Sequence, residues 1–403
     1  MPIRQHLYLA WAGVVGYHVF GWDHSAYGFL RLACNSEEFS PVMSAPALNQ
    51  SKRSAGLLLF AALALSIFCS LTHLAAQTAL TLEPGPKPQD TPARWKPWIG
   101  EYGPDGPLLN TVAEKDGQLI LSGKQLGECA VKEISASELR ASCHSNSNVR
   151  LVEEASGTFF LRTDAWNFTR RDFGVDASHV ARIQPVRPVA ELRAEALAAS
   201  PPHEDGTFRK PELVELTTLD PAIHLDIRYA TANDFLGTPV YTQARAFMQR
   251  PAAEALVRAL HKLQPLGYGL LIHDAYRPWY VTKIFWDATP PEGKIFVADP
   301  KEGSRHNRGC AADLTLYDLA TGKPIEMPGT YDEMSPRSFP DYPGGTSLQR
   351  WHRDLLRRAM ESEGFTVYEH EWWHFDYKDW REYPILNIKF EDLHSGQGLA
   401  SAN

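Results

Sequence analysis

The chain has 403 residues, enough for two or three domains of roughly 150 residues each. Its composition is that of a globular protein, with 44% hydrophobic and 22% charged residues. Forty Lys and Arg against 48 Asp and Glu give a net charge of −8, and the sequence contains no block rich in Lys or Arg. This argues against nucleic acid as a partner, because phosphate binding needs a basic surface. Five cysteines without a C-x-x-C pair exclude a disulfide scaffold and a sulfur-ligated zinc.

The first distinctive segment is an uncharged apolar run at residues 54–68, preceded by Lys52 and Arg53 and followed by small residues at 74–76. This order is typical of a secretory signal, and the run is shorter than the roughly 20 residues of a membrane span. We interpret residues 43–76, from Met43, as a signal peptide, and residues 1–42 as an over-extended start or a long n-region. The sequence thus predicts an exported protein of the periplasm or cell envelope. Membrane attachment is expected only if the signal is an uncleaved anchor.

A Pro-rich linker at residues 77–94 precedes a strand-rich stretch, residues 95–175. Alternating runs at 108–113 and 118–122 flank Asp116-Gly117, which is a strong hairpin signal. A second pair, at 149–152 and 158–162, flanks a turn ending at Gly157. We expect a small all-β module, which carries no catalytic cluster in its sequence and whose partner we leave open.

Two cysteines of this module, Cys129 and Cys143, would lie opposite each other in a hairpin that turns at residues 135–137. Opposite positions have Cα atoms about 4.5–5.5 Å apart, which a disulfide accepts. The alternative is a pair of buried thiols.

The second half of the chain mixes helices and strands. Residues 176–209 contain a helix at 187–199 and a second linker, and residues 394–403 form a tail. Between them, residues 210–393 show helical spacing at 251–263 and again from Thr346 or Ser347 to a stop at Gly364. Strands are expected at 268–273, 365–368 and 371–375. This pattern predicts an α+β domain large enough to enclose a site.

Three segments of this domain concentrate groups that suit hydrolysis of an amide. His306 and Asp313 stand seven residues apart around a turn, Glu371 lies three residues before His374, and Arg277 is followed by a rigid proline. Two histidines and one carboxylate suit a catalytic zinc with an open fourth position, at which water is acidified to a pKa of about 7. Glu371 could then move protons, and Arg277 could stabilise an oxyanion.

Each segment alone also has a structural interpretation, such as a packed histidine or a surface charge. We expect His273, His352 and His370 to be structural. The combination of the three segments in one domain is more specific evidence for a catalytic metal site than any one segment alone.

These residues resemble the zinc-dependent D-alanyl-D-alanine dipeptidases of the VanX type, from about Leu216 to Phe390. The S-x-H-x-x-G-x-A-x-D pattern of that family begins at Ser304 and ends at Asp313, and its E-W-W-H occupies residues 371–374. D-x-Y-R-P occupies residues 274–278, and further matches lie at residues 226–235, 331–334 and 363–365. Cys310 and Phe375 depart from the usual residues but remove no ligand.

The resemblance implies one zinc ion per catalytic domain, held by His306, Asp313 and His374. It implies Glu371 as the acid/base, Arg277 as the transition-state stabiliser, and Asp332 as the contact to the substrate amine, with Ser304 also in substrate binding. It also implies a small antiparallel sheet with flanking helices, the D,D-peptidase or hedgehog-like fold.

We therefore expect an exported zinc metallopeptidase that hydrolyses D-alanyl-D-alanine, or a close D,D-dipeptide, in cell-wall metabolism. One alternative is a D,D-carboxypeptidase or endopeptidase acting on peptidoglycan stem peptides. A non-haem iron oxygenase also uses two histidines and a carboxylate, but usually begins with His-x-Asp. A non-catalytic envelope-binding protein would need neither Glu371 nor Arg277.

Overall fold

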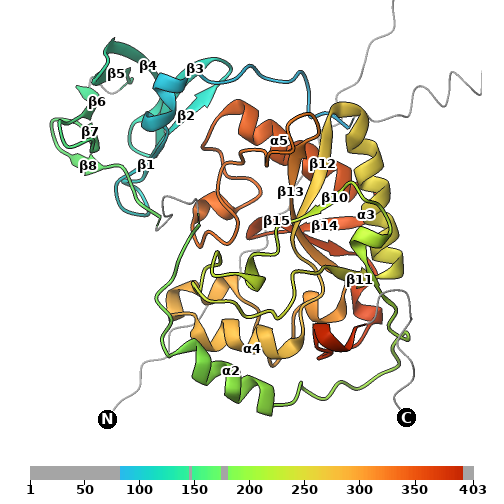
Figure 1. Cartoon of the computed structure of the whole chain (residues 1–403). Coiled ribbons are helices and arrows are strands. Elements are labelled where there is room, and N and C mark those ends of the chain that lie inside the picture. Colours follow the sequence, from blue (N-terminus) through green and yellow to red (C-terminus); the bar gives the residue numbers. More distant parts are fainter. Residues whose placement is uncertain (1–81, 145–147, 174–179, 394–403) are drawn as a thin grey trace, which may run out of the picture. The chain divides into compact units, whose positions relative to one another are not determined.

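The computed structural model of the chain describes residues 82–144, 148–173 and 180–393. All of these residues belong to one unit, Ala79–Asn403. Figure 1 colours them from blue to red along the chain. The expected signal peptide at 43–76, the stretch at 1–42 and the tail at 394–403 lie outside the described residues. Within the described ranges, no helix is both long and apolar enough to cross a membrane.

The β module is one antiparallel sheet in which each strand pairs with its neighbour in the chain. Its strands are β1 (Gly100–Tyr102), β2 (Asn110–Lys115), β3 (Gln118–Gly123), β4 (Gly127–Ser135), β5 (Glu138–Ser142), β6 (Val149–Glu153), β7 (Phe159–Arg162) and β8 (Asn167–Thr169). After β8 the chain returns to β1, where Arg170 forms a bridge with Tyr102. The backbone N–H of Arg171 donates to the carbonyl oxygen of Glu101 at 2.7 Å. The sheet therefore closes on itself.

The turn and the cysteines of the module lie where the sequence indicates. Asp116 and Gly117, between β2 and β3, have φ of 49° and 78°, the left-handed values of the tight hairpin turn that favours Asp-Gly. Cys129 and Cys143 form a disulfide with Cα atoms 4.7 Å apart, next to the cross-strand pair Ala130 and Ser142.

A buried carboxylate joins the module to the rest of the unit. Glu114 of β2 is 2% exposed, and its Oε2 accepts the backbone N–H of Ser347 at 2.7 Å. The Glu114 carbonyl accepts from Nη2 of Arg350 at 2.8 Å. Glu114 thus lies at the N-terminus of a helix, where a carboxylate is favoured by the helix dipole.

The second sheet lies in the C-terminal domain and has the order β10-β12-β13-β15-β14. Its strands are β10 (Ile223–Leu225), β12 (Tyr268–Asp274), β13 (Ala311–Asp318), β14 (Phe365–Tyr368) and β15 (Glu371–Tyr377). A separate antiparallel pair consists of β9 (Leu213–Glu215) and β11 (Phe247–Gln249). The expected wholly antiparallel sheet needs correction, because β10 runs parallel to β12 while the other pairs are antiparallel. Short strands such as β10 carry too little periodicity to reveal their direction.

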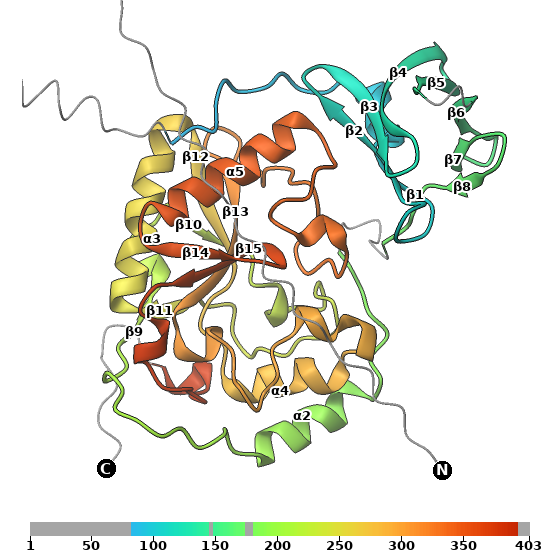
Figure 2. The same ribbon diagram turned by 180° about the vertical axis from the view of Figure 1, so that it is seen from behind.

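Four helices accompany the sheet in the described residues: α2 (Val189–Ala198), α3 (Arg250–Leu263), α4 (Trp279–Ala288) and α5 (Ser347–Glu361). Figure 2 shows α3 and α5 along the sheet, and α2 beside α4. Thr346 and Gln349 form a reciprocal capping box at the start of α5. Together these elements confirm the α+β pattern and bury one large core between sheet and helices.

Candidate active site

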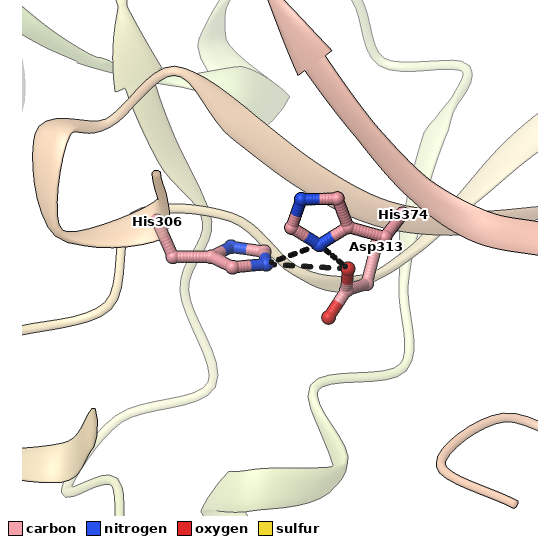
Figure 3. Close-up of side chains that lie close together, drawn as sticks. All are labelled: His306, Asp313 and His374. Carbon is pink, nitrogen blue, oxygen red and sulfur yellow. Dashed lines mark hydrogen bonds and ion pairs between the residues drawn. The ribbon is translucent and has the colours of Figure 1, made fainter. Parts of the chain in front are cut away.

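Three buried side chains converge at one end of β13. His306 lies in the turn before the strand, Asp313 within it, and His374 directly opposite Asp313 on β15. Nε2 of His306 and Nδ1 of His374 are 3.0 Å apart, and each lies within 3.2 Å of Oδ1 of Asp313 (Figure 3). The turn can be this tight because Gly309 has a φ of +69°, and a Cβ there would lie 2.6 Å from Leu213.

Each imidazole makes a hydrogen bond through the ring nitrogen that faces away from the cluster. The other nitrogen of each ring therefore directs its lone pair toward the centre of the cluster. Nδ1 of His306 donates to the backbone oxygen of Ala275 at 2.6 Å. Nε2 of His374 donates to Oδ1 of Asp376 at 2.8 Å. In the neutral rings the two nitrogens that face each other are then both acceptors, and at 3.0 Å they need either a proton or a metal ion between them. Such outer contacts are usual around metal-binding histidines, so the residues fit a metal ion.

The charges of the cluster point the same way. Burial alone would raise the pKa of Asp313, but His306 and His374 hold it well below its usual range. Burial would also keep His374 neutral, yet Asp376 and Asp313 raise its pKa to about 10. Without a metal, His374 therefore carries a proton and a positive charge. A bound divalent cation would take the place of that charge.

Glu371 begins β15 beside the cluster. Its Oε2 lies 3.7 Å from Nδ1 of His374, and its side chain is 13% exposed. Burial raises the pKa of Glu371 to about 8, with His374 opposing and Asp313 adding to the shift. A carboxyl group with such a pKa can accept and return a proton near neutral pH.

Arg277 is held rigidly between the strand end and α4. Its Nε donates to Oδ2 of Asp274 at 2.8 Å, and its Nη2 lies 3.7 Å from Oδ2 of Asp313. Its guanidinium lies over the rings of Phe285 and Tyr229. An arginine so placed offers a fixed positive charge to a developing oxyanion.

Asp332 and Ser304 line the same cavity, of about 110 Å³, as the cluster, Glu371 and Arg277. Asp332 has a φ of 59°, and its Oδ1 accepts from the Tyr229 hydroxyl at 3.0 Å. Its Oδ2 is buried without a hydrogen-bond partner in the described residues. Burial and Asp313 raise the pKa of Asp332 well above its usual range, so the side chain becomes a carboxylate when a cation such as an ammonium group lies beside it. Oγ of Ser304 accepts the backbone N–H of His306 at 3.2 Å and so steadies the turn.

The structure adds four residues that sequence reasoning did not assign to the site. Asp274 holds Arg277, Asp376 orients His374, Tyr229 donates to Asp332, and the Tyr331 hydroxyl donates to Oδ2 of Asp313 at 3.1 Å. Asp376 could have been found from its position two residues after His374, since alternate residues of a strand share a face. Tyr229 and Tyr331 could be found from the sequence only because they fall in the segments that match the family, residues 226–235 and 331–334.

A buried cluster of two histidines and a carboxylate, with a carboxyl group of raised pKa and an arginine in one cavity, defines a metal-dependent peptidase. A family model described as D-ala-D-ala dipeptidase matches residues 209–393. A D-alanyl-D-alanine dipeptidase of Escherichia coli (strain K12) is 36% identical over 179 residues, covering 44% of this chain and 91% of that protein.

Proteins with the same description from other bacteria are also similar to this chain. One from Enterococcus faecalis is 36% identical, over 43% of this chain and 95% of that protein. One from Streptomyces coelicolor is 35% identical, over 39% of this chain and 87% of that protein. This chain belongs to the D-alanyl-D-alanine dipeptidase family. The β module lies outside the matched residues.

Proposed function

We propose that the chain is a zinc peptidase that hydrolyses D-alanyl-D-alanine to two molecules of D-alanine. The observation that carries this proposal is the single small cavity in which the histidine–aspartate cluster, Glu371, Arg277 and Asp332 meet. The relatives described as D-alanyl-D-alanine dipeptidases support the choice of substrate.

His306, Asp313 and His374 would hold the zinc ion. Bound zinc supplies Lewis acidity to the carbonyl group and lowers the pKa of a water to about 7. Glu371 takes the proton of the attacking water and delivers it to the leaving amine. Arg277 stabilises the negative charge that develops on the carbonyl oxygen. The hydrogen bond that Arg277 donates to Asp274, together with the ion pair between them, keeps the guanidinium in place throughout.

The cavity favours a dipeptide over a longer stem peptide. Oδ2 of Asp332 is a buried acceptor without a partner in the described residues, and the free ammonium of a dipeptide would satisfy it. A stem peptide carries an uncharged amide at that position, whose N–H could donate a hydrogen bond but would leave the buried carboxylate without a positive partner.

A substrate panel tests this assignment. The purified protein with zinc is offered D-alanyl-D-alanine, L-alanyl-L-alanine and a pentapeptide ending in D-alanyl-D-alanine, and release of free alanine is measured. We expect rapid hydrolysis of the D,D-dipeptide and little of the other two. Faster release from the pentapeptide would favour the D,D-carboxypeptidase alternative.

We further propose that the protein acts outside the cytoplasm. The apolar run at residues 54–68 and the disulfide between Cys129 and Cys143 support export, because a disulfide persists in an oxidising compartment. Alkylation of protein recovered from the cell envelope, without reduction and followed by mass spectrometry, tests this. Both cysteines should remain unmodified, and uptake of the reagent by both would contradict the proposal.

A further inference from the structure

A second and larger cavity lies next to the active site. It measures about 430 Å³, and its lining includes Arg228, His273, Thr315, Tyr331 and Trp372. Tyr331 links the two sites, because its hydroxyl donates to Oδ2 of Asp313 while the residue also lines this second cavity. The mechanism described above makes no use of the space.

The second cavity follows from the same strands as the metal cluster. Thr315 stands two residues after Asp313 on β13, and Trp372 stands two residues before His374 on β15. Alternate residues of a strand point to one face, so the pairs Asp313 and Thr315, and His374 and Trp372, each share a face. On this face of the sheet, Asp313 and His374 are therefore metal-ligand candidates, and the next residues on the same face, Thr315 and Trp372, line the second cavity.

Three polar groups of the lining are buried without a hydrogen-bond partner in the part of the chain that the structure describes. They are Nη1 of Arg228, Oγ1 of Thr315 and Nε1 of Trp372. Thr315 and Trp372 are only 4% and 3% exposed. A buried polar group left unpaired destabilises the folded state, so native proteins seldom leave several together.

The chemistry of these groups indicates what is missing. The indole N–H and the guanidinium N–H can only donate, and the threonine hydroxyl can donate as well. Nε of Arg228 already donates to Oδ2 of Asp226 at 3.0 Å, which leaves Nη1 for another acceptor. The ligand should therefore present several acceptor atoms close together, as a carboxylate or a phosphate does.

The charge and the walls of the cavity agree with such a ligand. Its lining contains one acidic residue, Glu326, against four cationic ones, which are Lys96, Arg170, Arg228 and Arg337. Arg337 is neutralised by Glu333, Lys96 lies 3.4 Å from Glu326, and Arg228 forms an ion pair with Asp226 at 3.0 Å. The positive charge that remains in the lining is therefore that of Arg170. Apolar side chains complete the wall, among them Ile99, Ile325 and Met327.

We propose that this cavity binds a small organic anion. Its carboxylate or phosphate accepts hydrogen bonds from Arg228, Thr315 and Trp372, and its apolar part lies against Ile325 and Met327. The site is distinct from the proposed dipeptide site, whose cationic contact is Arg277.

Titration calorimetry of the full chain with model anions tests the proposal. Benzoate and phenyl phosphate represent the two acceptor groups on the same apolar ring, and benzyl alcohol is the neutral control. We expect one site per chain for the better anion, with affinity at least tenfold higher than for benzyl alcohol. The ratio of benzoate to phenyl phosphate affinity tells which acceptor group the site prefers.

Variants then locate the bound anion. Thr315→Val keeps the shape and removes the unpaired hydroxyl, and Arg228→Gln removes the charge, so each should weaken binding at least fivefold. Arg258→Gln, on the exposed surface of α3, is the matched control and should bind normally.

Two results would overturn the proposal. One is the absence of saturable binding of either anion, which would leave water as the occupant of the cavity. The other is binding that survives Thr315→Val and Arg228→Gln but is lost in Arg277→Gln, which would place the anion in the active site.

Discussion

The backbone oxygen of Ala275 accepts a hydrogen bond from Nδ1 of His306 at 2.6 Å, and Ala275 lies two residues before Arg277. The segment that carries the arginine therefore also sets the tautomer of a metal ligand. Asn307 strengthens this link, since its side-chain amide donates to the carbonyl oxygen of Arg277 at 2.8 Å. Two motifs separated by some thirty residues thus act as one assembly, and a change in either should disturb both metal binding and catalysis.

Replacement of Glu371 by glutamine should separate catalysis from metal binding. The amide keeps the shape of the side chain but cannot accept a proton, so kcat should fall about 10²–10⁴-fold. The zinc content, measured by atomic absorption, should stay near that of the unaltered protein. His306→Ala is the contrasting variant, because it should lose the metal itself. Near-normal turnover of Glu371→Gln at full zinc content would remove Glu371 from the mechanism.

Replacement of Arg277 by alanine should act on the transition state. Loss of one oxyanion-stabilising group is expected to lower kcat about 10²–10³-fold and to change KM much less. Steady-state kinetics with D-alanyl-D-alanine measure both constants, and Arg258→Ala serves as a surface control. A change confined to KM would make Arg277 a substrate-binding residue.

Asp332→Asn tests how the substrate amine is recognised. Asparagine tolerates the positive φ of this position and keeps the side-chain shape, so the variant removes mainly the charge. A hydrogen bond to a charged group contributes about 1.5–3 kcal/mol, so kcat/KM for D-alanyl-D-alanine should fall about 10–100-fold. N-acetyl-D-alanyl-D-alanine lacks the ammonium and should show little change. Equal losses on both substrates would contradict the assignment.

Part of the helix and strand pattern of the C-terminal domain could be predicted from sequence, although α4, β9 and β11 were not. Pro251 and the leucine spacing mark α3, and Thr346 with Gln349 marks the start of α5, because these signals are local. The direction of β10 and the pairing of Asp313 with His374 depend on contacts between distant segments. The same reason hides the contacts of Tyr331 and Ala275, which become visible only once β12, β13 and β15 lie side by side.

The pH dependence of stability should report on His352. This side chain is buried in α5, and its Nε2 accepts from the hydroxyl of Tyr268, which in turn accepts from Lys87. Burial, assisted by the charge of Lys87, lowers the pKa of His352 to about 4. In the unfolded chain the pKa is about 6.5, so the unfolded state binds the proton first as the pH falls.

Stability should therefore be lost between about pH 6.5 and pH 4, by on the order of 3 kcal/mol in total. Urea unfolding of metal-free protein at several pH values measures this, with His352→Gln as the non-titrating control. The stability of the variant should depend less steeply on pH than that of the unaltered protein. Parallel profiles would show that His352 does not titrate as the structure indicates.

Titration of metal-free protein with zinc tests the central claim most directly. D-alanine release from D-alanyl-D-alanine should be absent at first, rise in proportion to added zinc, and level off at one ion per chain. His374→Ala should stay inactive under the same conditions. Full activity of the metal-free protein, or of His374→Ala without zinc uptake, would contradict a zinc peptidase built on His306, Asp313 and His374.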